Sequence, residues 1–284
     1  MRIGVTGGSG RVGRAVVDLA LSQGHQVVSI DRVAPPAEAA ERAKVTYVVA
    51  DLGEYADLEA ALQDCDGLVH LAAIPSPNGR PDYEVHNTNV VASYNALSAA
   101  ARLGIDRVAQ ASSINATGAA YSRAPRYDYF PLDEQHPTYN EDPYSLSKWI
   151  CEEQADSFVR RHEHMRITSL RFHGVVPDRA NALARQHNPS PVHAKHLWGY
   201  TTFDAAARSC LLSLTADFDG HQVFYIVAPN TMVDTPSLEL KQRHYPEVPV
   251  RGNLDANRAF FNSSKAERLL GWRHDAAPVA GRVG

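Results

Sequence analysis

The sequence has little cysteine, no excess of positive charge and no long apolar run. Its three cysteines, Cys65, Cys151 and Cys210, lie far apart and form no CxxC pair, which argues against a disulfide framework and for a reducing, cytoplasmic compartment. The net charge of −4 argues against nucleic acid or an anionic membrane as a partner. No apolar stretch approaches the ~20 residues that span a bilayer, and no signal-peptide pattern precedes the first apolar run. We therefore expect a soluble, cytoplasmic protein.

Short apolar runs alternate with helical patterns over the first 175 residues. The runs are apolar on both faces, as in the strands of a covered parallel sheet, and between them apolar residues recur every three or four positions. This alternation predicts an α/β fold, a Rossmann-type doubly wound parallel sheet with right-handed crossovers. The expected strands are 2–6, 26–30, 45–50, 67–73, 107–113 and 166–172, and the expected helices are 11–24, 57–65, 85–104 and 142–163.

Beyond residue 175 the alternation becomes irregular. We expect residues 1–175 to form the sheet domain and residues 176–284 a small C-terminal lobe, interleaved with the first part and not independent of it. The lobe is expected to contain a helix over 202–216, a strand over 221–228, a helix over 263–272 capped by Ser263, and a poorly ordered tail from residue 274.

Three glycines lie at the junction between the first strand and the first helix. In the stretch TGGSGRVG, Gly7 would allow a tight turn, Gly10 would let a pyrophosphate approach the backbone, and Gly13 would let the helix pack close to the sheet. The helix N-terminus, with the amides of Arg11 and Val12, then offers hydrogen-bond donors to phosphate groups. Because the motif joins a strand to a helix, we favour dinucleotide binding over a purely structural turn.

The second expected strand ends in Ser-Ile-Asp-Arg. Asp31 follows the glycine turn by about 20 residues, where a carboxylate can bond the ribose hydroxyls of a dinucleotide. Its charge would repel a 2′-phosphate, so the sequence favours NAD over NADP. Arg32 keeps NADP open, because a cation there could hold that phosphate. A simple strand-end cap is the non-functional alternative for Asp31.

The stretch PYSLSKW contains a tyrosine and a lysine four residues apart. Tyr144 and Lys148 would share one face of a helix, whose start suits Asp142 and Pro143. A nearby ammonium group favours a phenolate and would lower the phenol pKa from its usual value of about 10. The pair could then exchange a proton with a substrate hydroxyl or carbonyl. In isolation the pattern favours an ordinary exposed helical pair, and only together with the glycine turn does it favour a catalytic pair.

Two serines end the strand expected over 107–113. Ligands in open α/β sheets bind beyond the carboxyl ends of the strands, which places Ser112 and Ser113 within reach of a substrate oxygen. A hydroxyl there could polarise a carbonyl or stabilise an alkoxide. The alternative for either serine is a local bond to the backbone.

In chain order these motifs resemble those of the extended short-chain dehydrogenase/reductase family, also called the NAD-dependent epimerase/dehydratase family. TGGSGRVG resembles its cofactor turn, HLAA (70–73) its strand beneath the cofactor, and LRFHGVVP the strand that leads into its substrate lobe. Ser-Ser followed by YSLSK resembles its Ser–Tyr–Lys triad, and SSKAERLLGW its usual ending. The resemblance implies an NAD-dependent enzyme, commonly a homodimer through its long helices.

The resemblance also implies roles for individual residues. Tyr144 would be the acid/base, Lys148 would lower its pKa and hold the nicotinamide ribose, and Ser113 would orient the substrate oxygen. The implied cofactor-binding residues are Gly7, Gly10, Arg11, Val12, Gly13, Asp31, Arg32, Asp51, Leu52, Leu71, Ala72, Ala73, Asn89, Ser112, Tyr144 and Lys148. The implied substrate-binding residues are Ser76, Ser113, Ile114, Asn115, Tyr144, Gly174 and Arg179.

Two departures from the family pattern bear on the substrate. Gly174 stands where nucleotide-sugar epimerases usually carry an asparagine, and the C-terminal lobe is short. Both favour a small free sugar, a monosaccharide or a uronate, as in the compact uronate dehydrogenases, although Ile114 and Asn115 depart from the motif of those enzymes. A nucleotide-sugar 4-epimerase or dehydratase is the alternative, and a non-catalytic dinucleotide-binding regulator is a second, against which the intact triad argues.

Three further features are given less weight. His193 and His196 form an HxxH pair without cysteine or acidic ligands nearby, so we expect no metal site. Segment 126–134 is aromatic and charged; an ordinary surface loop is the expected interpretation, although its place between Ser113 and Tyr144 would let it border the substrate. Arg179 and Arg185 could hold a carboxylate bidentately, or could simply be solvated.

Overall fold

The computed structural model describes residues 1–35, 42–184 and 191–275. A seven-stranded, wholly parallel sheet runs through its centre in the order β3-β2-β1-β4-β5-β6-β9, which confirms the predicted fold class. The strand order reverses between β1 and β4, and this switch point creates a crevice at the carboxyl ends of the strands. The strands are β1 (Arg2–Thr6), β2 (Gln26–Asp31), β3 (Val45–Val49), β4 (Gly67–His70), β5 (Arg107–Ser113), β6 (Arg166–Phe172) and β9 (His221–Ile226).

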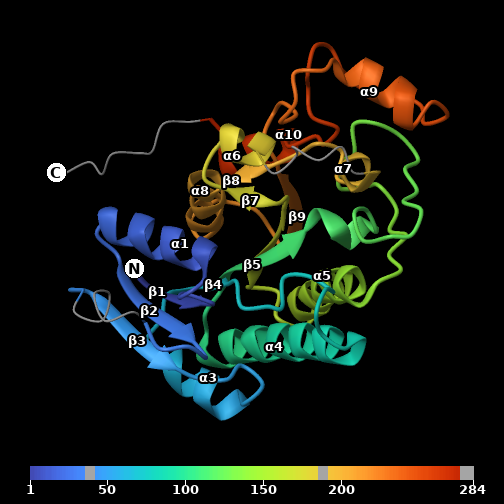
Figure 1. Cartoon of the computed structure of the whole chain (residues 1–284). Helices are drawn as coiled ribbons and strands as arrows, with labels where there is room; N and C mark the ends of the chain where they lie inside the picture. Colours follow the sequence, from blue (N-terminus) through green and yellow to red (C-terminus); the bar gives the residue numbers. More distant parts are fainter. Residues whose placement is uncertain (36–41, 185–190, 276–284) are drawn as a thin grey trace.

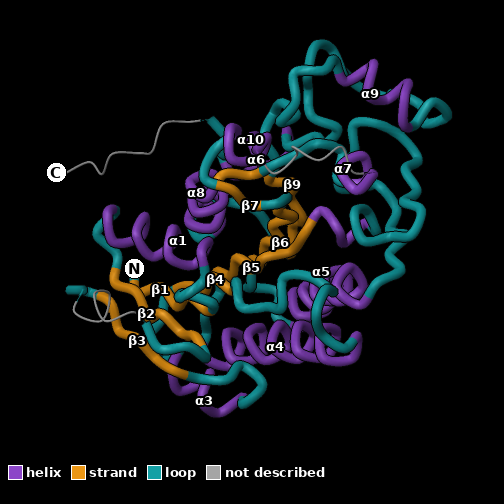
Figure 2. The backbone as a smooth tube through the Cα atoms, in the orientation of Figure 1, coloured by secondary structure: helices purple, strands orange, loops and turns teal. Residues whose placement is uncertain are grey.

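Helices cover both faces of the sheet, which explains why its strands are apolar throughout (Figures 1 and 2). On one face, Val16 of α1 and Cys210 of α8 share a core with the strands. On the other, Leu58 of α3, Leu97 of α4 and Phe158 of α5 share a second core. These helices are α1 (Arg11–Ser22), α3 (Tyr55–Ala61), α4 (Asp82–Leu103), α5 (Pro143–Arg161) and α8 (Phe203–Ser213).

The ends of the elements differ from the sequence prediction by a few residues, as terminal turns usually do. The largest difference that affects the site is in β4, which ends at His70 and not at residue 73. The segment 71–73 therefore leaves the sheet at its carboxyl edge, where it can border a ligand.

The second half of the chain contributes to the same sheet. β9 is its seventh strand, and α8 packs against α1. The remaining elements form the lobe and its approaches; they are η1 (Ile114–Thr117), β7 (Val175–Val176), α6 (Arg179–Ala184), α7 (Pro191–Lys195), β8 (Thr201–Thr202), α9 (Ser237–His244) and α10 (Ser264–Leu270).

Segment 126–134 is part of the core of the lobe, so the expectation of a surface loop was wrong. Phe130 is fully buried, with its ring centroid 4.9 Å from that of Phe260. Its backbone amide donates to the carbonyl of Pro249 at 2.9 Å, and Leu132 donates to Phe260 at 2.8 Å. Aromatic partners more than a hundred residues away bury this segment, and no local pattern encodes them.

The cap of α10 also differs from the prediction. Ser263 occupies the N-cap position, but its hydroxyl contacts the backbone of Val227 and does not cap the helix. The amide of Ser264 instead donates to Asn262 Oδ1 at 3.0 Å. Of the tail expected to be poorly ordered, residues 276–284 lie outside the described residues.

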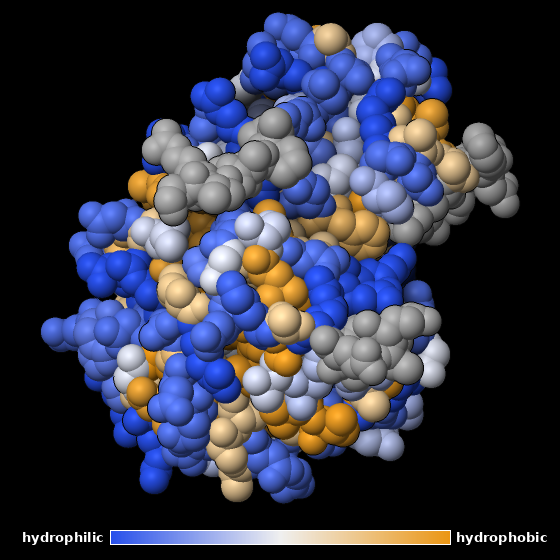
Figure 3. Space-filling model, turned by 90° about the vertical axis from the view of Figure 1, so that its left-hand side faces the viewer, coloured by the Kyte–Doolittle hydropathy of each residue, from blue (hydrophilic) through white to orange (hydrophobic). Residues whose placement is uncertain are grey.

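The surface of the described residues is mostly polar, with scattered apolar groups. On the side shown in Figure 3, apolar patches lie among polar residues. None of the helices among the described residues is both long and apolar enough to cross a bilayer. Cys65, Cys151 and Cys210 are all free thiols, as their spacing predicts.

Candidate active site

A continuous groove follows the carboxyl edge of the sheet. It consists of a hollow of about 650 Å³ beside β2 and β3 and one of about 470 Å³ beside β5 and β6. The two hollows share Gly7, Gly10, Leu71 and Ala73, so the groove crosses the switch point between β1 and β4. An extended ligand such as a dinucleotide is expected at this place in a doubly wound sheet.

The glycine turn at the middle of the groove fits a pyrophosphate. Gly7 has a φ of +70°, and a Cβ at Gly13 would lie 2.1 Å from the carbonyl oxygen of Gly7, so neither position accepts a side chain. Helix α1 begins after Gly10, and its first intrahelical bond runs from Arg14 N to Gly10 O. The amides of the preceding residues 11–13 are therefore available to an anion at the helix N-terminus.

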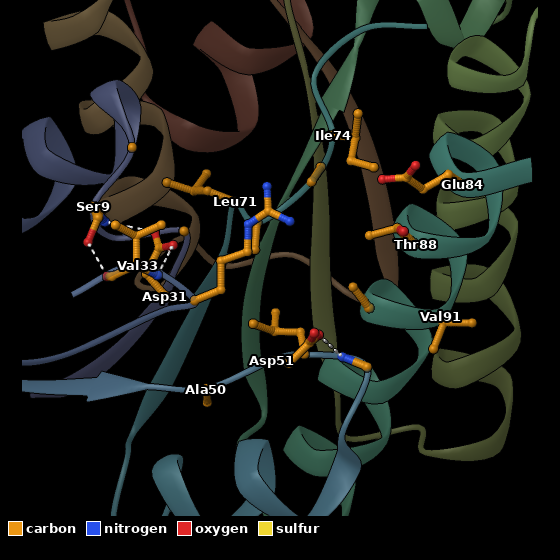
Figure 4. A pocket seen from close by; sticks show the side chains of 18 residues that line it. Ser9, Asp31, Val33, Ala50, Asp51, Leu71, Ile74, Glu84, Thr88 and Val91 are labelled. Atoms are coloured by element: carbon orange, nitrogen blue, oxygen red, sulfur yellow. Dashed lines mark hydrogen bonds between the residues drawn. The ribbon is translucent and has the colours of Figure 1, made fainter. Parts of the chain in front are cut away.

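The larger hollow has carboxylates at the ends of two strands (Figure 4). Asp31 ends β2, and its carboxylate accepts bonds from the amides of Ser9 at 3.0 Å and Val33 at 3.3 Å. Asp51 follows β3 and accepts a bond from Gly53 at 2.8 Å. Across the hollow, α4 supplies Glu84, Thr88 and Val91. An adenosine would thus lie between the strand ends and α4.

The structure brings most of the predicted residues to this groove. The larger hollow, the candidate adenosine hollow, is lined by Gly7, Gly10, Asp31, Arg32, Asp51, Leu52, Leu71, Ala72 and Ala73. The second hollow adds Arg11, Val12, Gly13, Ser112, Ser113, Ile114, Asn115, Tyr144, Lys148 and Gly174. Three predicted residues, Ser76, Asn89 and Arg179, line neither hollow.

Those three side chains contact other parts of the chain. Asn89 is buried and bonds both backbone groups of Ile74 and the hydroxyl of Ser147, so it positions the groove wall. Arg179 pairs with Asp234 at 2.5 Å, which gives no support to its contact with a substrate. Ser76 Oγ accepts a bond from the amide of residue 78, and Arg185 lies outside the described residues.

The start of α5 presents the tyrosine and the lysine as predicted. Asp142 caps the helix by accepting bonds from the amides of Tyr144 and Ser145 at 3.0 and 2.9 Å, and Pro143 occupies its first turn. Lys148 Nζ lies 5.9 Å from the centroid of the Tyr144 ring and donates to Ala111 O at 2.9 Å. One helical turn thus faces the end of β5.

Burial controls the electrostatics of this pair. Desolvation raises the pKa of Tyr144 well above its usual value, while a hydrogen bond with Ser113 acts in the opposite direction. Desolvation also lowers the pKa of Lys148, opposed by Cys151 and Glu152. In the protein alone the net pKa of the phenol is therefore raised and not lowered as expected, because desolvation of the buried phenol outweighs the opposing contributions. The ammonium meanwhile donates to the carbonyl of Ala111.

The two serines of β5 have different surroundings. Ser113 is close enough to Tyr144 to affect its pKa. The hydroxyl of Ser112 instead donates to Glu152 Oε1 at 2.5 Å, so the expectation that this hydroxyl binds the cofactor is not supported. Glu152 in turn makes a two-point contact with Arg171 at 2.9 and 2.7 Å, and both side chains are buried, 5% and 6% exposed.

Three consecutive residues of β5 are bonded to α5. Gln110 Nε2 donates to Cys151 O at 2.9 Å, Lys148 donates to the carbonyl of the next residue, and Ser112 donates to Glu152. We call these three bonds, together with Arg171, the β5–α5 clasp. The clasp fixes the distance between the end of β5 and the first turn of α5, and hence between Ser113 and Tyr144.

Sequence reasoning missed several side chains at the substrate end of the groove. Tyr121, His173, His196 and Phe203 all line the second hollow. His173 directly follows β6, so the strand-end rule used for the two serines could have found it. Tyr121 and His196 lie in connecting segments. No sequence signal marks Tyr121, and His196 stands out only as half of an HxxH pair. The described residues contain no group of three or more metal-ligating side chains.

The sequence was compared with families and curated proteins. Residues 3–193 match the model of the NAD dependent epimerase/dehydratase family. The UDP-glucose 4-epimerase of Azospirillum brasilense is 30% identical over 202 residues, which cover 69% of this chain and 54% of that protein. The L-arabinose 1-dehydrogenase (NAD(P)(+)) of Haloferax volcanii is 30% identical over 177 residues, 60% of this chain and 66% of that protein.

The fold was compared with solved structures. A mutated uronate dehydrogenase superimposes with a TM-score of 0.70 at 22% identity, covering 98% of this chain and 82% of that one. At this identity the similarity concerns the fold. The matches to the first curated relatives span about half of their length, so those relatives do not fix the substrate.

The β5–α5 clasp leads to a stability prediction. Replacing Glu152 by Gln removes the negative charge and leaves Arg171 buried without a counter-ion. We expect the free energy of unfolding to fall by about 3 kcal/mol, measured as a lower midpoint of chemical denaturation at an unchanged slope.

The exposed pair of Glu239 and Arg243 on α9, 2.7 Å apart, provides the control. Glu239→Gln should change the free energy of unfolding by less than about 0.5 kcal/mol, because water screens such a pair. Equal losses in the two variants would contradict the assignment of the Glu152–Arg171 pair as a buried constraint.

Proposed function

Because the chain belongs to the NAD-dependent epimerase/dehydratase family, we propose that it transfers hydride between NAD and a hydroxyl or carbonyl carbon of a sugar, either a free monosaccharide or a uronate. One observation carries this proposal above all. Ser113, Tyr144 and Lys148 converge in the hollow that continues the groove beyond the glycine turn.

Each member of this group has a separate task. Tyr144 takes the hydroxyl proton when the sugar is oxidised and returns it on reduction. Ser113 holds the same substrate oxygen and stabilises charge that develops on it. Lys148 supplies positive charge beside the phenol and favours its ionised form. NAD, when bound, supplies the hydride acceptor, and the protein provides alignment.

Asp31 supports NAD as the preferred cofactor over NADP. Its carboxylate lies at the end of β2 in the adenosine hollow, held by two backbone amides. A 2′-phosphate at this point would meet a negative charge. Arg32 lines the same hollow and, among the described residues that line it, is the cation that favours NADP.

The substrate end supports a small sugar over a nucleotide sugar. Gly174 has no side chain with which to hold a nucleotide. The space around this position is open, because a Cβ there would have no heavy atom within 4 Å. The L-arabinose dehydrogenase similarity points in the same direction. The epimerase similarity keeps a nucleotide-sugar 4-epimerase or dehydratase as the second candidate, in which hydride is taken and returned. A non-catalytic regulator would have no use for the three converging side chains.

A substrate screen tests the proposal. We expect purified protein with NAD to form NADH with one or more free aldoses or uronates and none with UDP-sugars. Tyr144→Phe should lower kcat by at least ~100-fold, because proton transfer contributes about 10²–10⁴, while binding of NADH, followed by its fluorescence, remains.

The exposed Tyr83 of α4 gives the matched control, and Tyr83→Phe should keep wild-type kcat. Conversion of a UDP-sugar without net NADH would replace the dehydrogenase by the epimerase. Wild-type turnover in Tyr144→Phe would remove Tyr144 from the mechanism.

The pH dependence follows from the buried phenol. Sugar oxidation requires the phenolate, and burial raises the pKa of Tyr144. We therefore expect kcat/KM for oxidation to rise with pH and that for reduction to fall. Lys148→Met should move the rising limb to higher pH, whereas Lys241→Met on α9 should leave it in place. A pH-independent kcat/KM would contradict the role of Tyr144.

We also propose a cytoplasmic homodimer that forms through α4 and α5. Its support is exposed apolar surface on α4, where Val91 and Tyr94 are 45% and 49% exposed; within the chain the Tyr94 ring also packs against Phe158 of α5. Tyr94→Arg should shift sedimentation from dimer to monomer, and Leu238→Arg on α9 should not. Identical sedimentation of both variants would place the interface elsewhere.

A further inference from the structure

Two polar aromatic side chains border the hollow next to Tyr144. The ring of Tyr121 meets that of Tyr144 edge-on, at 5.7 Å between centroids and 90° between planes. The His196 ring lies 6.5 Å beyond Tyr121 at 78°. All three side chains line the hollow. Tyr121 and His196 therefore lie where the part of a substrate that extends past the reacting carbon must pass.

The two side chains come from distant segments that are tied together. Lys195 Nζ donates to the carbonyls of Ser122 at 2.7 Å and Arg123 at 2.9 Å. The hydroxyl of Tyr127 donates to the carbonyl of Lys195 at 2.8 Å. The bonded residues directly follow Tyr121 on one segment, and Lys195 directly precedes His196 on the other. The three bonds therefore hold the two segments, and with them the two rings, close to each other.

His173 completes the support. Its Nε2 donates to the carbonyl of His196 at 2.7 Å, and its Nδ1 accepts a bond from the amide of Gly174 at 2.6 Å. Both ring nitrogens of His173 are thus occupied, which makes it a positioning residue. By contrast, neither the hydroxyl of Tyr121 nor the ring of His196 makes a hydrogen bond to any residue that the structure describes.

We propose that Tyr121 and His196 form a subsite that bonds the hydroxyls of an uncharged sugar. This inference rests on the proposed sugar oxidoreductase function and selects neutral aldoses over uronates. The subsite offers a phenol hydroxyl and an imidazole, each of which can donate or accept a hydrogen bond. Such groups match sugar hydroxyls, which also do both.

Charge in the hollow agrees with this selection. Among its described lining residues the only lysine or arginine side chains are Arg11, in the glycine turn, and Lys148, which bonds the carbonyl of Ala111. Burial, with a contribution from His193, lowers the pKa of His196 to about 4, so its ring is neutral near physiological pH. Beside Tyr121 and His196, a carboxylate would be partly desolvated with no further cation among the described lining residues to pair with it, which is unfavourable.

Steady-state kinetics of the protein test the subsite, with the sugar varied at saturating NAD and NAD varied at a fixed high sugar concentration. The substrates are a panel of neutral aldoses and the uronates that match them. For the wild type we expect kcat/KM to be at least ~100-fold higher with the best aldose than with its uronate. Tyr121→Phe and His196→Gln should each raise KM for that aldose by about 5- to 100-fold, with a smaller change in kcat and an unchanged KM for NAD.

Two variants outside the hollow serve as controls. Tyr139→Phe removes a phenol that bonds Asp128, and His164→Gln removes an exposed imidazole; both should keep the wild-type KM. Lys195→Met should raise KM for the aldose through the loosened segments, again without changing KM for NAD. This split separates a role at the substrate from a general loss of structure.

The outcomes separate the two proposals. If the wild type oxidises sugars but prefers uronates, or if Tyr121→Phe and His196→Gln both keep the wild-type KM, the subsite is wrong and the oxidoreductase proposal stands. If the wild type binds NADH but oxidises no sugar on the panel, the oxidoreductase proposal is wrong and the subsite falls with it.

Discussion

The buried ion pair between Glu152 and Arg171 is the constraint on which the site depends. It joins α5 to β6, and through the hydroxyl of Ser112 it also reaches β5. Because a buried charge that loses its partner is strongly unfavourable, these three elements have little freedom to slide. The first turn of α5 and the end of β5 therefore keep one relative position, and that position brings Ser113 to Tyr144.

The same constraint shapes the electrostatics around Lys148 and Tyr144. Burial opposes the charged form of Lys148. The carboxylate of Glu152, one turn of α5 beyond Lys148, favours the positive charge of the lysine. The guanidinium of Arg171 forms an ion pair with the carboxylate of Glu152. An ammonium can thus persist in a desolvated site, where its effect on a neighbouring phenolate is larger than it would be in water.

The sequence predicted what local patterns encode, and the structure added what long-range packing decides. Strand–helix alternation gave the parallel sheet, and the Asp142–Pro143 start gave the shared face of Tyr144 and Lys148. The partner of Ser112 could not be read, because Glu152 and Arg171 meet only after a full crossover. Segment 126–134 was misjudged for a similar reason, since its aromatic partners lie in the last third of the chain.

The residues proposed for cofactor binding and those proposed for substrate selection lie largely on different sides of Tyr144. The residues that would hold a dinucleotide follow β1 to β4, where the backbone and strand-end carboxylates determine the geometry. The residues that would meet the sugar follow β5 and β6 or lie in connecting segments, such as Tyr121 and His196. Connecting segments that are held by a few side-chain bonds, such as those of Lys195, can change in amino-acid sequence without disturbing the sheet. A change of sugar therefore requires no change in the clasp or the glycine turn, which is a physical reason why one sheet can serve dehydrogenases and epimerases alike.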